Sequence, residues 1–86
     1  MVGREVLWSA KAAKSLARID RATRDRIMAK VHQLADDPQS MMNNVKPMKG
    51  SNNLWRLRVG DWRVLYTETF IVVSVIRVAP RGSAYE

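Results

Sequence analysis

Two runs in which large apolar residues recur at every second position, Leu54–Val59 and Trp62–Thr67, restrict the fold of this chain more than any other feature. Successive side chains of a strand point to opposite faces, so this alternation predicts two strands, each with one apolar face. The residues between the runs, Gly60-Asp61, are typical of a two-residue hairpin turn. A third strand-like run, Phe70–Val78, follows, and the C-terminal part of the chain is therefore predicted to form an antiparallel sheet.

The N-terminal part has a helical period after one short strand. Glu5–Trp8 predicts that strand, and Ser9 is well placed to cap a helix that begins at Ala10. Asp20 interrupts this helix and is expected to cap a second one, which ends before Pro38. Apolar residues recur at spacings of three and four: Ala12, Ala13, Leu16, Ala17 and Ile19 in the first helix, and Ile27, Val31 and Leu34 in the second. Each helix thus has one apolar stripe that must be covered.

Residues 38–53 are predicted to be a long loop, because they are rich in proline, glycine, serine and asparagine. Long loops in small domains are often functional, which makes Lys46 and Lys49 candidate ligand contacts. A solvated connection without a function is the alternative.

The predicted order of elements is strand, helix, helix, strand, strand, strand. This order predicts an α+β fold with a mainly antiparallel sheet and both N-terminal helices packed on one face. The chain of 86 residues has room for one compact domain, residues 1–86, and too little for two.

The charge of the chain is strongly positive. Fifteen lysines and arginines against eight aspartates and glutamates give a net charge of +7, and ten of the fifteen cations are arginines. The planar guanidinium pairs bidentately with phosphate or carboxylate, so this bias points to nucleic acid or an acidic protein as a partner. A basic surface that serves only solubility is the alternative.

The composition also argues against several kinds of site. There is no cysteine and only one histidine, which excludes disulfides and cysteine nucleophiles and argues against a zinc site, so no metal or other cofactor is expected.

No apolar run approaches the roughly 18 to 20 residues that cross a bilayer. The opening MVGREVLWS carries charge where an export signal is apolar, and a cytoplasmic location is expected.

Arginines are predicted to gather on one side of the hairpin. Arg56 and Arg58 share one face of their strand, about 6.6 Å apart, and the alternation in the next strand sets Arg63 beside them. We call this side of the two strands the cationic face. Like charges this close disfavour folding, so the cluster is easier to explain if an anion binds there; an ordinary charged surface is the alternative. Pro80 is expected to stop the pairing of the last strand, and the tail could add Arg81 and Tyr85 to the cluster.

Several segments together resemble a known family. They are the opening REVLWSAKAAKSLARID, the helix end LADDP, the VKPMKG loop, the run LWRLRVGDWRVLY, the strand IVVSVIRV and the ending PRGSAY. Over nearly its whole length the chain resembles the RelE branch of the RelE/ParE toxin superfamily, the toxic halves of bacterial and archaeal toxin-antitoxin pairs. The resemblance implies a fold similar to microbial ribonucleases. It also implies metal-independent cleavage of messenger RNA in the ribosomal A site, leaving a 2′,3′-cyclic phosphate and a 5′-hydroxyl.

The resemblance assigns the catalytic positions to Arg56, Arg58, Arg63, Arg81 and Tyr85. Well-studied members have lysines where this chain has Arg56 and Arg58. A guanidinium, whose pKa exceeds about 12, cannot take the proton from a 2′-hydroxyl, but it can bind phosphate and stabilise the charge that develops there. RNA contacts are expected from Lys46, Lys49, Arg56 and Arg58.

Two residues are candidates for the general base. Tyr85 is one candidate, if neighbouring cations lower its pKa, and Lys49 is another, if the loop delivers it. His32 is expected to lie in the second helix, away from the cationic face, and Glu68 is expected to be solvated in a tight turn.

The resemblance further implies partners: the ribosome and messenger RNA as targets, and a cognate antitoxin that forms a hetero-oligomer with the toxin. An acidic, partly disordered antitoxin that folds on contact would suit the basic surface. Two other functions stay open. One is the ParE branch, which poisons DNA gyrase; the other is a non-catalytic module that binds nucleic-acid phosphates.

Overall fold

The computed structural model describes residues 3–50 and 53–81 of the chain. Its elements follow in the order β1 (Glu5–Trp8), α1 (Ala10–Ala17), α2 (Arg21–Asp36), the 3-10 helix η1 (Pro38–Asn44), β2 (Val45–Pro47), β3 (Trp55–Val59), β4 (Trp62–Glu68) and β5 (Val72–Pro80).

Both predicted helix starts are confirmed. The Ser9 hydroxyl accepts a hydrogen bond from the Ala12 N–H at 3.0 Å, and α1 begins at Ala10. The carboxylate of Asp20 accepts one from the Thr23 N–H at 3.0 Å, which satisfies a backbone donor at the start of α2. This hydrogen bond also lowers the pKa of Asp20 below its usual value.

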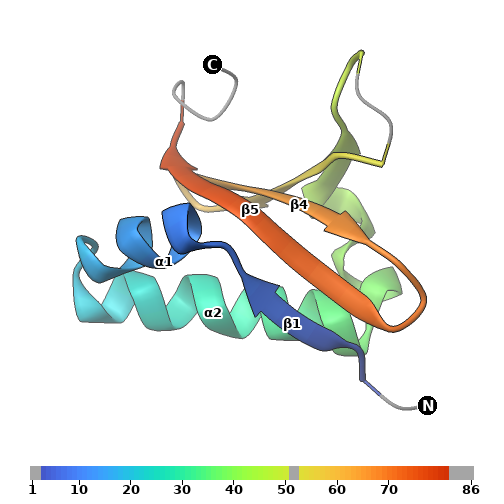
Figure 1. Ribbon diagram of the computed structural model, residues 1–86, viewed down its shortest axis with the longest axis horizontal. Helices are drawn as coiled ribbons and strands as arrows, with labels where there is room; N and C mark the ends of the chain where they lie inside the picture. The colour runs from blue at the N-terminus through green and yellow to red at the C-terminus, as the bar shows by residue number, and fades with distance from the viewer. Residues whose placement is uncertain (1–2, 51–52, 82–86) are drawn as a thin grey trace.

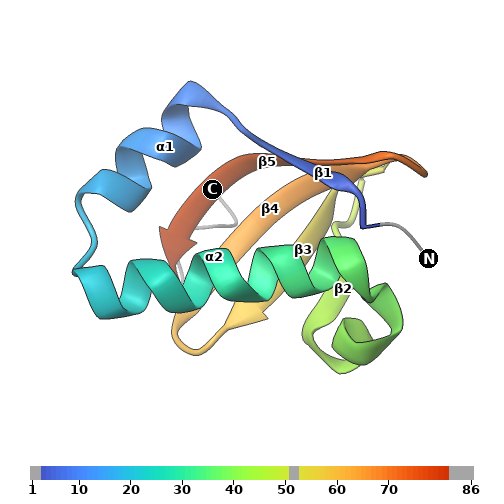
Figure 2. The ribbon, with the colours of Figure 1, turned by 90° about the horizontal axis from the view of Figure 1, so that it is seen from below.

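The five strands form one sheet in the order β1-β5-β4-β3-β2. Strand β1 runs parallel to β5, and the other three pairs are antiparallel. Both α-helices lie on the same side of this twisted sheet (Figures 1 and 2). The predicted α+β fold, with a mainly antiparallel sheet and the helices on one face, is confirmed.

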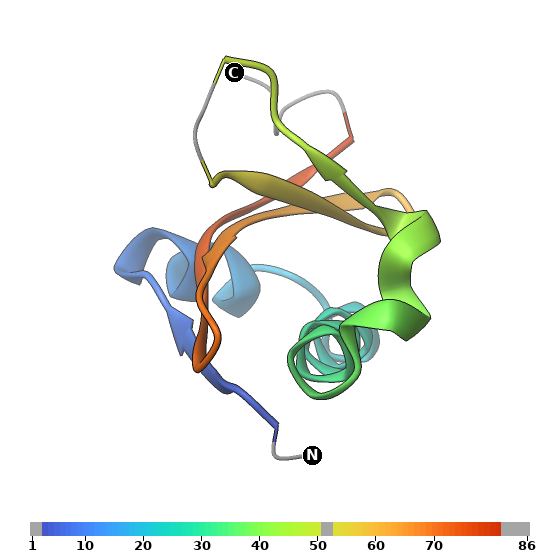
Figure 3. The ribbon, with the colours of Figure 1, turned by 90° about the vertical axis from the view of Figure 1, so that its right-hand side faces the viewer.

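The core lies between the helices and the concave side of the sheet (Figure 3). Its fully buried side chains come from both layers: Ala12, Ile27 and Val31 from the helices, and Leu57, Val64, Tyr66, Val73 and Val75 from the strands. The predicted alternation in β3 is therefore correct, since Leu57 faces the helices and its neighbours do not. Within the described residues, no helix combines the length and the hydropathy needed to cross a membrane.

The prediction of a continuous loop over residues 38–53 is wrong. Pro38 opens the 3-10 helix η1, which Met41 anchors in the core, and Val45–Pro47 then pairs with β3. Periodicity missed both elements because a three-residue strand is too short to show an alternation, and its last residue is a proline.

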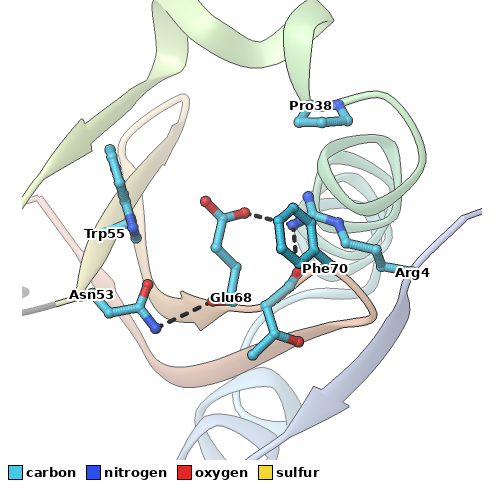
Figure 4. A pocket seen from close by; sticks show the side chains of 7 residues that line it. Arg4, Pro38, Asn53, Trp55, Glu68 and Phe70 are labelled. Carbon is cyan, nitrogen blue, oxygen red and sulfur yellow. Dashed lines mark hydrogen bonds and ion pairs between the residues drawn. The ribbon is translucent and has the colours of Figure 1, made fainter.

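The prediction that Glu68 is solvated in a tight turn is wrong. Glu68 is the last residue of β4 and is half-buried. Its carboxylate accepts a hydrogen bond from Arg4 Nη1 at 2.6 Å (Figure 4). Arg4 also donates to the backbone oxygens of Leu34, at 2.9 Å, and Ala35, at 3.2 Å. Arg4 thereby ties the entry to β1 to the end of α2 and to the β4–β5 connection, an arrangement that local periodicity does not reveal.

Candidate active site

The pairing of β3 with β4 brings the predicted arginines together. Arg58 lies directly opposite Arg63, and Leu57 lies opposite Val64. Leu57 and Val64 are fully buried against the helices, so Arg56, Arg58 and Arg63 lie on the other side of the sheet. The predicted cationic face therefore exists.

Strand β2 extends the cationic face, because Lys46 lies opposite Arg56. A pocket of about 140 Å³, which we call the arginine pocket, opens here; its lining residues are Asn43, Asn44, Lys46, Arg56, Arg58 and Arg63. Lys46 was a predicted contact residue. Asn43 and Asn44 were not singled out by the sequence, because they belong to the segment that was predicted to be a loop.

Arg63 is held in place by the hairpin turn. Its Nη1 donates to the backbone oxygens of Trp62, at 3.1 Å, and Gly60, at 3.3 Å, and the residue is only 6% exposed. Within residues 3–50 and 53–81, no carboxylate lies within ion-pair distance of Arg58 or Arg63. Two adjacent guanidinium groups, one of them buried, raise the local positive potential, which a bound anion would offset.

Arg77 joins the cationic face through an irregularity in β5. Tyr66 lies opposite Val75, but the preceding residue, Leu65, lies opposite Arg77, so Ile76 is an extra residue in β5. A strict alternation would have placed Arg77 on the same side as Val75, which faces the helices. The bulge shifts the alternation by one residue and turns Arg77 to the cationic face.

Strand β5 ends at Pro80, as predicted, and Arg81 is nevertheless attached to the end of the sheet by one further hydrogen bond. Strand β5 includes Pro80 opposite Trp62, and the Arg81 N–H donates to the Asp61 oxygen at 2.7 Å. Backbone N–H groups alternate along a strand, so the nitrogen of Pro80 points away from β4. Strand β1 has already ended on that side, at the partner of Val75, and the missing donor therefore breaks no ladder hydrogen bond.

Lys49 and His32, which were considered as bases, both lie outside the arginine pocket. Lys49 is exposed in the turn after β2 and does not line the arginine pocket. His32 is exposed on α2, which covers the opposite side of the sheet, as predicted. Tyr85 lies outside the described residues. Among residues 3–50 and 53–81, no group of three histidine, cysteine, aspartate or glutamate side chains could hold a metal ion.

Comparison with solved structures identifies the fold. The chain of the archaeal RelE-RelB complex from Pyrococcus horikoshii OT3 matches with a TM-score of 0.78 at 24% identity, over 95% of this chain and 99% of that one. The RelBE toxin-antitoxin complex of E. coli gives 0.73 at 17% identity, over 93% and 98%. The YoeB dimer from Staphylococcus aureus gives 0.70 at 12% identity, over 88% and 94%. These three structures and this chain share one fold.

The sequence itself matches a family of known proteins. Residues 6–85, nearly the whole chain, match the family described as "ParE toxin of type II toxin-antitoxin system, parDE". A comparison with curated protein sequences found no match. The chain therefore belongs to the ParE toxin family, within the RelE/ParE superfamily of type II toxin-antitoxin toxins.

Proposed function

We propose that this toxin is a ribosome-dependent endoribonuclease that inhibits translation by cleaving messenger RNA in the A site. The observation that carries the proposal is the pair of opposed arginines, Arg58 and Arg63, which line one pocket and have no described carboxylate as a partner. A pocket of about 140 Å³ is smaller than the sites that enclose whole small molecules. Its size and charge suit a single phosphate group, with the sugar and base outside.

The proposed reaction is an attack of the 2′-oxygen on the neighbouring phosphorus. The bond from the 2′-oxygen to phosphorus forms while the bond from phosphorus to the 5′-oxygen of the next nucleotide breaks. A base takes the proton of the 2′-hydroxyl, and the leaving 5′-oxygen takes up a proton. The products are a 2′,3′-cyclic phosphate and a 5′-hydroxyl.

The arginines stabilise the negative charge that grows on the phosphoryl oxygens. Arg63 is suited to this role because its hydrogen bonds to the turn fix its guanidinium before substrate arrives. Arg58 and Arg56 add charge from β3, and Arg81 adds charge from the end of β5. This positive charge takes the place that a metal ion holds in many other phosphoryl-transfer sites.

None of these arginines can act as the base, because a guanidinium stays protonated in proteins. We assign the base role to Tyr85. Lys49 is the second candidate, although it does not line the arginine pocket.

An antitoxin is the proposed partner. The related toxins of Pyrococcus horikoshii and E. coli were solved in complexes with their antitoxins. An acidic segment of such a partner would neutralise the cationic face and block access of RNA.

Induced expression, with mapping of RNA 5′ ends, tests the proposal. We expect cuts at A-site codons of translated messages and a fall in protein synthesis. ParE-type poisoning of DNA gyrase is a second candidate, because the matching family is described as ParE toxin. Gyrase-linked DNA breaks without A-site cuts would assign that activity. If neither DNA breaks nor A-site cuts are seen, the remaining function is a non-catalytic module that binds nucleic-acid phosphates.

A further inference from the structure

An apolar groove lies on the helix side of the sheet, opposite to the arginine pocket. Two adjoining cavities of about 620 Å³ and 270 Å³ form it, and both are lined by Pro38, Trp55 and Glu68. We call the two cavities together the Trp55 groove. It lies between the start of η1, the start of β3 and the end of β4, with Trp55 on one side and Phe70 and Arg4 on the other (Figure 4).

The walls of the groove expose large apolar side chains to solvent. Phe70 is 99% exposed and Met42 is 68% exposed. Trp55 is half-buried and packs against the core. Apolar side chains that gather around a concave surface mark interaction sites more often than isolated ones do.

Two polar side chains of the groove, Glu68 and Asn53, offer acceptors to a ligand. Arg4 uses its donors on Glu68 Oε1 and on the backbone oxygens of Leu34, Ala35 and Thr69. The second carboxylate oxygen of Glu68 has no partner among the described residues, and it lies on the side of Trp55 in Figure 4. The Asn53 amide donates its N–H to the Glu68 backbone oxygen at 3.2 Å, which leaves the amide oxygen as another acceptor. These acceptors suit a ligand that brings donors.

The surroundings favour a cationic donor. Asp36 and Asp37 are exposed at the C-terminal end of α2, directly before Pro38, where the helix dipole is negative. In a chain of net charge +7, these two carboxylates favour positive charge at this end of α2.

We propose that the Trp55 groove binds an apolar segment of a protein partner that carries a lysine or arginine among its apolar residues. The cation pairs with the Glu68 carboxylate and stacks on the Trp55 indole, and the apolar side chains cover Phe70 and Met42. The proposal rests on the proposed antitoxin as that partner, and it is independent of the cleavage chemistry.

The two sites are separated by the sheet itself. Trp55 and Arg56 are neighbours in β3 and therefore point to opposite faces. A segment in the Trp55 groove leaves the arginine pocket open, so masking the arginines requires a second, acidic segment of the same partner. That segment reaches the cationic face around the edge of the sheet formed by β2. Tight binding and inhibition are thus separate properties of the complex.

The first test measures the affinity between the toxin and the antitoxin encoded beside it. Phe70→Ser removes an exposed ring, so the variant folds normally, and we expect its affinity to fall by about tenfold or more. Ile71→Ser is the matched control: Ile71 is 72% exposed and does not line the groove, and its affinity should stay within about twofold. Equal affinity of Phe70→Ser and the parent overturns the proposal.

The second test addresses the cation. A double-mutant cycle combines Glu68→Gln in the toxin with Lys→Met or Arg→Met changes at each apolar-flanked cation of the antitoxin. We expect one antitoxin position to show coupling, and no coupling at any position overturns the cationic part of the proposal.

Two further measurements separate the alternatives. Sedimentation of the toxin alone shows whether it forms a dimer that Phe70→Ser dissociates, which would assign the groove to a second copy and overturn the proposal. RNA cleavage by Phe70→Ser without antitoxin should equal that of the parent. If neither protein cleaves RNA but the affinity results hold, the proposed endoribonuclease function fails and the groove assignment stands.

Discussion

Arg58 and Arg63 lie directly opposite each other across β3 and β4, and no described carboxylate lies within ion-pair distance of either. Cross-strand neighbours of like charge destabilise a sheet, by about 1 kcal/mol for a pair near the surface. The protein keeps this arrangement in the arginine pocket, where a bound phosphate would reverse the sign of the interaction. Repulsion within this pair therefore lowers the stability of the sheet, and the same pair would bind the phosphate in the proposed activity.

Arg58→Met should separate stability from activity. The exposed Arg58 loses its charge but keeps much of its length, so we expect the free energy of unfolding to rise by up to about 1 kcal/mol. Cleavage should fall by on the order of 100-fold, because a charge that stabilises the transition state is lost. Urea denaturation and RNA cleavage measure the two effects. Arg21→Met, on the exposed side of α2, is the control for loss of one positive charge; a less stable Arg58→Met variant would contradict the repulsion argument.

Arg81→Ala should abolish growth inhibition without unfolding the protein. The substitution keeps the backbone N–H that donates to Asp61, so the end of β5 stays attached. Only the guanidinium is lost, and a single missing donor of this kind lowers the rate by roughly 100 to 1,000-fold. Growth after induction at matched expression measures the effect, and full toxicity would remove Arg81 from the mechanism.

Leu57→Arg should prevent folding. Leu57 is fully buried between the sheet and the helices, and an unpaired charge there costs several kcal/mol. That cost is comparable with the total stability of roughly 4 to 13 kcal/mol that a domain of this length has. Circular dichroism during thermal melting tests it: a soluble variant with a cooperative transition would show that Leu57 tolerates the charge.

Tyr85→Phe tests the proposed base. The variant keeps a ring that can stack on a nucleobase and loses only the ionisable oxygen, so ribosome binding should persist while cleavage falls by roughly 100-fold or more. Single-turnover cleavage on programmed ribosomes measures this, with Tyr85→Ala as the comparison. If Tyr85→Phe cleaves as fast as the parent and only Tyr85→Ala is slow, the ring stacks and the base is Lys49 or a group of the ribosome or substrate.

Tyr66 should make the protein less stable in alkali. Burial raises the pKa of the Tyr66 phenol above its ordinary value near 10, so the folded state holds this proton where the unfolded state releases it. The unfolded state binds fewer protons above pH 10, and stability therefore falls as the pH rises, by up to about 1.4 kcal/mol per pH unit. Urea denaturation between pH 9 and pH 11 measures the slope relative to Tyr66→Phe, which should show a smaller loss.

The sequence alone was sufficient for the features that depend on neighbouring residues. Period-two alternation on both sides of Gly60-Asp61 predicted the β3–β4 hairpin and the side of the sheet on which Arg56, Arg58 and Arg63 lie. Ser9 and Asp20 predicted where both helices begin, because a cap is a contact over three residues. Such interactions are short in sequence, so their pattern is visible without the rest of the fold.

Only the tertiary structure decided the features that depend on distant partners. Val45–Pro47 becomes a strand because β3 supplies the hydrogen bonds, and this pairing brings Lys46 to the arginines. Arg77 reaches the cationic face because a bulge opposite β4 shifts the alternation of β5, whereas its local pattern pointed to the core. Arg4 and Glu68 meet across 64 positions of sequence and form the polar part of the Trp55 groove. In each case the stabilising contact joins segments that are far apart in the chain. A local periodicity does not show which distant residues will meet.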